Sequence, residues 1–352
     1  MFDCVNFDQF RNVLLYLRVN NTEVIIMLKQ QSKFDYTNLS MPDPLSHRLR
    51  FEVEQTLSCL YADASLVDQM EGLYLPFSSW LSQKAHAGKG PLVVGVGGAQ
   101  GCGKTTFCSV ISRILSKGFD LNCIVISLDD LYSTRQDRMK FANQTTPMFS
   151  VRGVPGTHDV SFALSLFERL KNLKEGEVMK FPRFDKSIDD RKAVHLWQEV
   201  QGPVDVVLFE GWCVGAPPMV EGMDQPLNQL EAEMDTDGLW RHKVNQLLKD
   251  DYKALFSQID LMAWMQAPNY EVVYYWRDKQ ERVLESHLHD IHGILLDTID
   301  LKVMSSKELK QFMQYYERLT RHMLAVMPGK ADVLFQLNEK QEVMEMRFPV
   351  EH

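Results

Sequence analysis

A glycine-rich stretch, GVGGAQGCGKTT at residues 95–106, is the part of the sequence best suited to bind a charged ligand. Within it, the segment 98–105 matches GxxxxGK[ST], a pattern whose small residues let backbone N–H groups point at phosphate oxygens. In this pattern Lys104 reaches the β- and γ-phosphates and the Thr105 hydroxyl ligates Mg²⁺. The sequence therefore predicts a nucleoside triphosphate site. Its expected phosphate binders are Gly98, Ala99, Gln100, Gly101, Cys102, Gly103, Lys104, Thr105 and Thr106.

Acidic residues follow two apolar runs at the points where those runs end. Asp129 and Asp130 lie in SLDDLY, and Glu210 stands near the end of the run 204–211. A carboxylate at a strand end can accept a proton from an attacking hydroxyl or hold Mg²⁺ through water. We expect Asp129 to be a catalytic base and Glu210 to join Thr105 at the metal. The alternatives are that an aspartate only caps a helix and that the glutamate only pairs with a lysine.

Two loops marked by prolines, VRGVPGTHD and FPRFDKSIDDR, concentrate cations in a chain whose net charge is −9. Arginine offers a planar fork that suits a carboxylate or a phosphate, so these loops favour a small anionic substrate. A solvated, salt-bridged surface is the alternative. Together with two residues of SLDDLY, the expected substrate-binding residues are Asp130, Tyr132, Arg152, His158, Asp159, Lys186 and Arg191.

A further arginine, Arg277, lies in YYWRDKQER, within a helical pattern over 270–290. An arginine brought over the phosphates by a lid would neutralise charge in the transition state. We expect Arg277 to be catalytic together with Lys104 and Asp129, whereas a charged helix face is the alternative. The same helix and the loop 132–150 are expected to cover the site and exclude water.

Alternating strand and helix patterns must position these residues. Near-continuous apolar runs predict buried parallel strands, and 3–4 spacing predicts the helices between them. This alternation predicts an α/β fold of the P-loop NTPase type, with three layers (α/β/α) and a mainly parallel sheet. Residues 1–88 are expected to form a helical N-terminal extension, and 89–352 the P-loop domain. The predicted strands are 91–97, 123–130, 204–211, 259–268 and 331–338; the predicted helices include 161–173, 238–257, 270–290 and 306–326.

Composition excludes several function classes. The acidic balance, 47 Asp and Glu against 38 Lys and Arg, argues against nonspecific attraction to nucleic acid or an anionic membrane. No run of about 18 apolar residues predicts a membrane span. The six cysteines form no CxxC pair, which indicates neither a zinc site nor a disulfide framework and fits a reducing compartment. We expect a cytoplasmic protein, because the N-terminus does not read as a signal peptide. The sequence does not indicate the oligomeric state.

Seven motifs in this order resemble the D-glycerate 3-kinase family, the plant-type glycerate kinases and their bacterial and fungal relatives. They are GGAQGCGKTT, SLDDLY, VRGVPGTHD, FPRFDKSIDDR, VVLFEGWCVG, PLNQLE and WRDKQE, and the resemblance runs from about residue 90 to 340. The family is similar to phosphoribulokinase, uridine kinase and bacterial pantothenate kinase. RGVPGTHD, EGWCVG and PLNQLE are its more specific parts, whereas the glycine loop is common to the whole superfamily.

The resemblance implies ATP-dependent phosphorylation of a small hydroxy acid, D-glycerate, to 3-phosphoglycerate, with Mg²⁺. It implies that Asp129 is the base on the acceptor hydroxyl, that Asp159 and Arg191 lie on the substrate side, and that Glu210 is the acidic strand-end residue. The N-terminus lacks the Arg/Ser-rich, acid-poor look of a plastid transit peptide, which favours a bacterial-type cytoplasmic protein. One rival interpretation is another kinase of this superfamily, acting on a nucleoside, pantothenate or a sugar phosphate. The other is a noncatalytic ATP-binding regulator whose N-terminal helices bind a partner.

Overall fold

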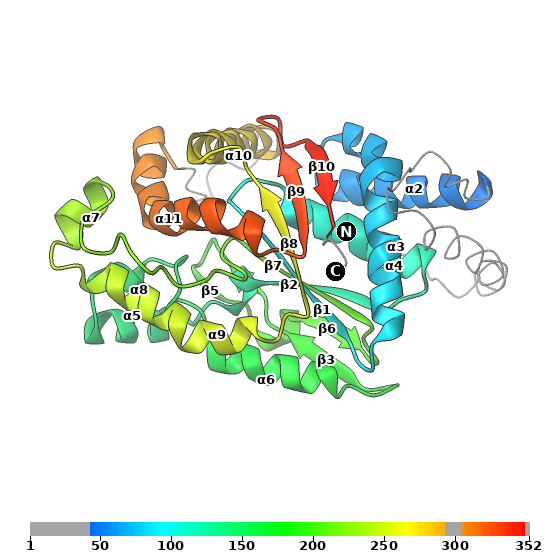
Figure 1. Ribbon diagram of the computed structural model, residues 1–352, viewed down its shortest axis with the longest axis horizontal. Coiled ribbons are helices and arrows are strands. Elements are labelled where there is room, and N and C mark those ends of the chain that lie inside the picture. Colours follow the sequence, from blue (N-terminus) through cyan, green and yellow to red (C-terminus); the bar gives the residue numbers. More distant parts are fainter. Residues whose placement is uncertain (1–42, 293–303, 349–352) are drawn as a thin grey trace.

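A six-stranded sheet in the order β10-β9-β8-β1-β7-β2 lies at the centre of the protein (Figure 1). The computed structural model describes residues 43–292 and 304–348. The first five strands in chain order are mutually parallel, as predicted, and β10 adds an unpredicted antiparallel edge. The strands are β1 (Leu92–Gly98), β2 (Cys123–Ser127), β7 (Val206–Gly211), β8 (Leu261–Gln266), β9 (Val333–Leu337) and β10 (Val343–Arg347).

Helices cover both faces of the sheet. Successive strand residues point to opposite sides, and both sides are lined by buried hydrophobic residues. In β7, Leu208 packs with one hydrophobic cluster and Phe209 with the other. The Leu208 side carries α2 (Asp43–Cys59), α3 (Leu75–Ala87), α4 (Lys104–Gly118) and α10 (Tyr270–His292). The Phe209 side carries α6 (Val160–Lys171), α8 (Leu239–Lys249) and α9 (Asp251–Phe256), while α11 (Ser306–Val326) contributes to both. The predicted three-layer α/β/α fold is therefore confirmed.

Several local predictions need correction. The segment 132–150 is not a loop, because it contains α5 (Arg135–Gln144) and a short 3-10 helix, Pro147–Ser150. The single helix predicted over 238–257 is two helices, α8 and α9, divided at Asp250. The strand predicted over 123–130 ends at Ser127, and Asp129 lies on the 3-10 helix Leu128–Leu131.

The remaining elements lie outside the central sheet. A two-stranded antiparallel pair joins β3 (Val178–Phe181) to β6 (Gln198–Gln201). A smaller hairpin pairs β4 (Phe184–Asp185) with β5 (Asp190–Arg191), within the loop predicted to bind substrate. The short helix α7 (Gln229–Met234) follows the long connection after β7.

The described part of the N-terminal segment, residues 43–88, is helical as predicted and shares its core with the sheet. The ring centroid of Phe77, on α3, lies 5.6 Å from that of Phe107 on α4 and 5.1 Å from that of Phe335 on β9. A hydrogen bond also joins α4 to α2, where Nε of Arg113 donates to Glu52 at 2.7 Å. Residues 1–42 of the predicted extension lie outside the described residues, and the division at residue 88 stays a prediction.

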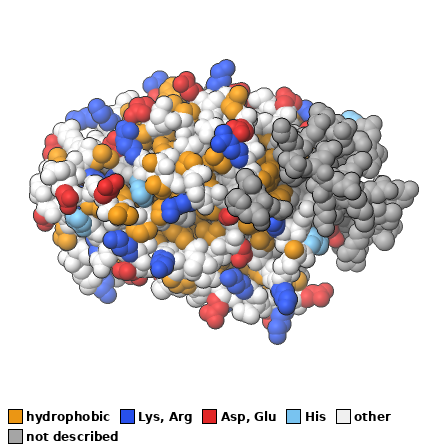
Figure 2. Space-filling model, in the orientation of Figure 1, with side chains coloured by type: hydrophobic (Ala, Val, Ile, Leu, Met, Phe, Trp, Pro, Cys, Tyr) orange, Lys and Arg blue, Asp and Glu red, His pale blue; other side chains and the backbone are white. Residues whose placement is uncertain are grey.

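The surface is mixed in charge. On the face shown in Figure 2, acidic and basic side chains are interspersed among hydrophobic ones rather than gathered by sign. Within residues 43–292 and 304–348, no helix is long and apolar enough to cross a membrane.

We expect Phe77→Ala to lower the free energy of unfolding by about 3–5 kcal/mol, because it opens a cavity between α3, α4 and β9. Urea unfolding followed by circular dichroism measures this. Phe51→Ala is the matched control, since Phe51 of α2 is 57% exposed and should change stability little. A separate early transition in Phe77→Ala, with the main transition unmoved, would show that the N-terminal helices fold independently of the sheet.

Candidate active site

The glycine loop turns sharply between the end of β1 and the start of α4. Gly101 and Gly103 have φ of +78° and +91°, in the left-handed region that favours glycine. A Cβ atom at Gly101 would lie 2.9 Å from Cβ of Trp276, because α10 packs directly against the loop. A Cβ atom at Gly103 would meet nothing within 4 Å, so the space beside the first turn of α4 is open. Backbone amides and a helix N-terminus around an open space fit a phosphate group.

Lys104 is the first residue of α4, and its side chain folds back over the loop. Its Nζ donates to the Ala99 carbonyl oxygen at 2.9 Å and lies 3.7 Å from Sγ of Cys102. The ammonium has three donors, and a sulfur is a weak acceptor, so donor capacity remains for a phosphate oxygen. The nine predicted phosphate binders run from the last residue of β1, Gly98, through this loop into the first turn of α4.

Glu210 is held next to the loop by the sheet itself. In the parallel pairing of β7, it lies in register with Val96 of β1 on one side and Ser127 of β2 on the other. Thr105 Oγ1 donates to Glu210 Oε1 at 3.1 Å, which unites the two predicted metal ligands. Burial raises the pKa of Glu210 above its ordinary value, although the Lys104 ammonium works in the opposite direction.

The hydroxyl and carboxylate oxygens of this pair are the ligand type that Mg²⁺ prefers. Across the described ranges, no group of three or more His, Cys, Asp or Glu side chains could hold a metal by itself. A Mg²⁺ ion here would therefore take most of its remaining ligands from phosphate oxygens and water, as is usual when it binds with a nucleotide.

Asp129 sits just past the end of β2, with two partners on its carboxylate. Lys186 Nζ donates to Oδ2 at 2.7 Å, and the Tyr132 hydroxyl donates to Oδ1 at 3.1 Å. Burial is the largest single influence and would raise the pKa of Asp129, but the Lys186 ammonium, with the Tyr132 hydrogen bond and the nearby His158, outweighs it, so the pKa lies below its ordinary value. Asp129 is therefore an ionised carboxylate at neutral pH, able to accept a proton.

The other predicted substrate residues of this region make contacts that shape the acceptor side. Asp130 pairs with Arg183 at 2.6 Å and accepts from the Phe184 backbone N–H at 3.0 Å, which ties the β4–β5 hairpin to the 3-10 helix that follows β2. Arg191 pairs with Asp159 at 2.9 Å and donates to the Tyr132 carbonyl oxygen at 2.8 Å. Asp159 also caps α6 by accepting from the Phe162 backbone N–H at 3.1 Å.

Arg152 and Arg277 are each held by an ion pair. Arg152 pairs with Asp189 of the hairpin, and its carbonyl oxygen accepts from Tyr316 Oη at 3.1 Å. Arg277 stands on α10 next to the glycine loop and pairs with Glu281 on its own helix. The structure thus brings Asp129, Tyr132, His158 and Lys186 together, whereas Arg277 is oriented by a separate ion pair.

One important pair was not found from the sequence. Arg138 of α5 is fully buried, and its Nη2 donates to both the carboxylate and the carbonyl oxygen of Asp189 at 2.7 Å. Asp189 has φ of +56°, an uncommon conformation for a residue with a side chain. This pair holds the hairpin beside Arg152. A basic residue inside a polar segment gave no sequence signal for such burial.

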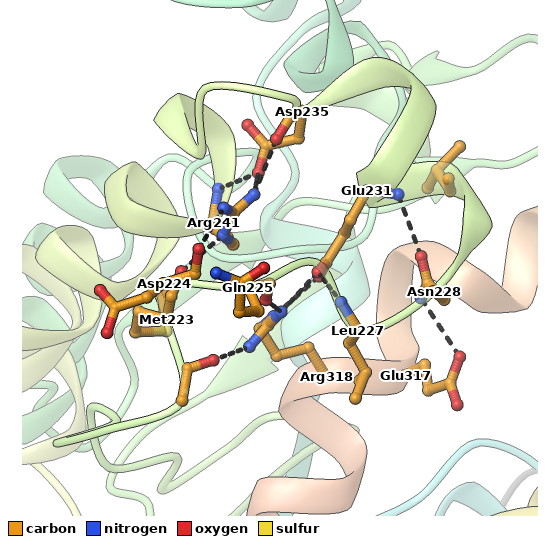
Figure 3. A network of polar contacts seen from close by, with 12 residues as sticks. Met223, Asp224, Gln225, Leu227, Asn228, Glu231, Asp235, Arg241, Glu317 and Arg318 are labelled. Atoms are coloured by element: carbon orange, nitrogen blue, oxygen red, sulfur yellow. Dashed lines mark hydrogen bonds and ion pairs between the residues drawn. The ribbon is translucent and has the colours of Figure 1, made fainter.

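The motif PLNQLE fixes the connection that follows β7 (Figure 3). Glu231 is fully buried, accepts from the Leu227 backbone N–H at 2.7 Å and receives Nε of Arg318 at 2.8 Å. Asn228 caps α7 and donates to the Gln314 carbonyl oxygen of α11 at 3.0 Å. A second buried pair, Arg241 with Asp235, holds the adjacent turn. This motif therefore anchors a long connection rather than contacting the glycine loop.

The sequence of this chain matches those of known kinases. Residues 93–220 match the phosphoribulokinase/uridine kinase family. The chain is also 30% identical over 235 residues to the uncharacterized kinase mug58 of Schizosaccharomyces pombe, covering 64% of this chain and 78% of that protein.

The chain belongs to the phosphoribulokinase/uridine kinase family. It is a kinase with a nucleotide-binding P-loop, which is the enzyme class predicted from the sequence. Chloroplastic D-glycerate 3-kinase of Arabidopsis thaliana is 36% identical over 203 residues, covering 54% of this chain and 41% of that protein. The solved structure of D-glycerate 3-kinase from Cryptococcus neoformans is 26% identical, with a TM-score of 0.62. It covers 78% of this chain and 97% of the other.

We expect Lys186→Met to shift the acidic limb of kcat/KM for the phosphoryl acceptor to higher pH, by about one unit or more. The base is active above the pKa of Asp129 and loses its charge as pH falls through it. Without the Lys186 ammonium, burial dominates and the pKa of Asp129 rises. Lys180→Met, which breaks a 3.0 Å ion pair between Lys180 of β3 and Glu199 of β6, is the control and should leave the limb in place. An unmoved limb in both variants would contradict the role of Asp129 as the base.

Proposed function

We propose that this kinase transfers the γ-phosphoryl group of Mg·ATP to the C3 hydroxyl of D-glycerate, giving 3-phosphoglycerate. The observation that carries the proposal is the pairing of Asp129 with Lys186 beside the glycine loop, which sets a base and a cation within one acceptor site. Two relatives that bear the name D-glycerate 3-kinase support the choice of acceptor.

The phosphates of ATP would lie along 98–106, with Lys104 on the β- and γ-phosphates. Thr105 and Glu210 would hold Mg²⁺, which when bound neutralises charge on the phosphate oxygens. Phosphoryl transfer asks little covalent chemistry of the protein, so positioning and charge neutralisation carry most of the rate. Arg277 is the candidate to add positive charge, after release from Glu281.

The carboxylate of D-glycerate would be held by cations that already bind carboxylates. Arg152, Lys186 and Arg191 each pair with an aspartate in the structure. The Lys186 side chain is 62% exposed, the most accessible of the three, so the substrate can reach it with least rearrangement. Drawing Lys186 away from Asp129 would also raise the proton affinity of the base. In this proposal the acceptor activates its own base by binding.

Exclusion of water falls to the helices around the site. We propose that α10 closes from the side of the glycine loop and α5 from the side of the hairpin, in place of the loop first expected at 132–150. Closure of this kind prevents transfer of the phosphoryl group to water. Cys102, Cys108 and Cys213 are buried free thiols, which suits the reducing cytoplasm that we propose as its location.

We expect D-glycerate to stimulate ADP release from ATP, with 3-phosphoglycerate as the product identified by ³¹P NMR. Asp129→Asn should lower kcat by about 100- to 10,000-fold with little change in the KM for ATP, because it removes the base but not the phosphate loop. Asp237→Asn is the control, since exposed Asp237 accepts from the Leu239 backbone N–H at the start of α8 and asparagine can keep that hydrogen bond. Lys104→Ala gives the background rate.

No stimulation by D-glycerate, or a product phosphorylated at C2, would contradict the proposed reaction. A large rise in the KM for ATP in Asp129→Asn would instead place this carboxylate on the metal side.

A further inference from the structure

His158 is a buried histidine, and the ring of Tyr132 connects it to the candidate base, Asp129. It is 6% exposed, and its ring stacks on that of Tyr132 with centroids 4.5 Å apart and planes 16° from parallel. Tyr132 in turn donates its hydroxyl to Asp129. The two aromatic residues are paired as an isolated antiparallel bridge, which fixes their backbones together.

The hydrogen bonds around Tyr252 determine which ring nitrogen of His158 carries the proton. Tyr252 Oη, on α9, accepts from the Gly156 backbone N–H at 2.9 Å. The tyrosine hydroxyl also carries a hydrogen of its own, and the acceptor within reach of it is Nδ1 of His158, 2.6 Å away. This contact favours an unprotonated Nδ1. The opposite tautomer would leave both the tyrosine hydrogen and the Nε2 lone pair without a partner, whereas this one leaves only the Nε2 hydrogen unpaired.

The second nitrogen, Nε2, therefore carries a hydrogen and has nothing to donate it to. Among the described residues it is a buried polar atom without a hydrogen-bond partner. An unpaired buried donor destabilises the free protein. Burial also lowers the pKa of His158 to about 3, so the ring stays neutral. The donor thus recognises an oxygen by hydrogen bonding without contributing a charge.

We propose that His158 Nε2–H donates a hydrogen bond to an oxygen of the acceptor substrate, and that Tyr252 is the positioning residue that holds this tautomer. The inference rests on the proposed function and adds to it separate roles for two residues. Asp129, ionised, accepts from the hydroxyl that is phosphorylated, while His158 donates to a second oxygen, either the C2 hydroxyl or the carboxylate. A substrate with adjacent hydroxyl and carboxylate oxygens satisfies both groups.

The tautomer is tested in the wild-type protein by two-bond ¹⁵N–¹H correlation of the His158 ring. We expect Nδ1 unprotonated and Nε2 protonated, with the Nε2–H resonance moving when D-glycerate binds with a nonhydrolysable ATP analogue. Tyr252→Phe should mix the tautomers, whereas Tyr315→Phe, in a partly buried tyrosine of α11 outside this network, should not. A protonated Nδ1 in the wild type, or an Nε2–H resonance unmoved by D-glycerate, would overturn the inference.

The contact is tested by kinetics with D-glycerate, 3-hydroxypropanoate, which lacks the C2 hydroxyl, and glycerol, which lacks the carboxylate. We expect His158→Phe to lower kcat/KM for D-glycerate roughly 10- to 100-fold. The loss should vanish for the one analogue that lacks the contacted oxygen. His158→Gln, which keeps an N–H donor, should recover part of the rate, and thermal melting checks that both variants fold.

An equal loss on all three acceptors, or no loss, would overturn the inference while leaving D-glycerate phosphorylation intact. Failure of the wild type to phosphorylate D-glycerate would instead overturn the proposed function, and the ring-nitrogen experiment without acceptor would still decide the tautomer. The two failures are therefore distinguishable.

Discussion

The parallel pairing of β7 between β1 and β2 is the constraint on which the site depends. It places Glu210 in register with Val96 and Ser127, so the glycine loop, the glutamate and the start of the Asp129 helix emerge at one sheet edge. Carboxyl ends of parallel strands are where ligands bind in such folds. A shift of β7 by one residue against β1 or β2 would turn Glu210 to the opposite face of the sheet and destroy this alignment.

A second constraint is that the acceptor side carries its cations in pairs with carboxylates. Lys186 with Asp129, Arg152 with Asp189 and Arg191 with Asp159 leave these positive charges compensated. An anionic substrate must therefore replace an aspartate rather than fill a vacant cationic site. Breaking an ion pair is offset only by a ligand of matching charge and geometry, which favours specificity over affinity. The buried Arg138 also pairs with Asp189, so Asp189 keeps a cationic partner if Arg152 turns to the substrate.

Much of this could be predicted from the sequence because it depends on local patterns. The glycine loop, its flanking strand and helix, and the order of the parallel strands follow from residue types and periodicity over short windows. Asp129 and Glu210 were located as strand-end carboxylates for the same reason. The helical character of residues 43–88 also follows from local patterns, but the packing of Phe77 against Phe107 and Phe335 does not.

What the sequence could not supply are the contacts between distant segments. His158 and Tyr252 are 94 residues apart, and their bond requires α9 to pack beside the loop before α6. Arg138 and Asp189 are likewise joined only by the fold, as are Asn228 and α11. The segment 132–150 looked like a loop because its helices have a weak apolar pattern, with Arg138 among the buried residues of α5.

The most direct test of the account is a crystal structure with a nonhydrolysable Mg·ATP analogue and D-glycerate bound together. We expect the triphosphate in the 98–106 loop, the acceptor hydroxyl within about 3.5 Å of both the γ-phosphorus and the Asp129 carboxylate, and Lys186 turned to the substrate carboxylate. A γ-phosphate directed away from Asp129, or D-glycerate bound elsewhere, would contradict it.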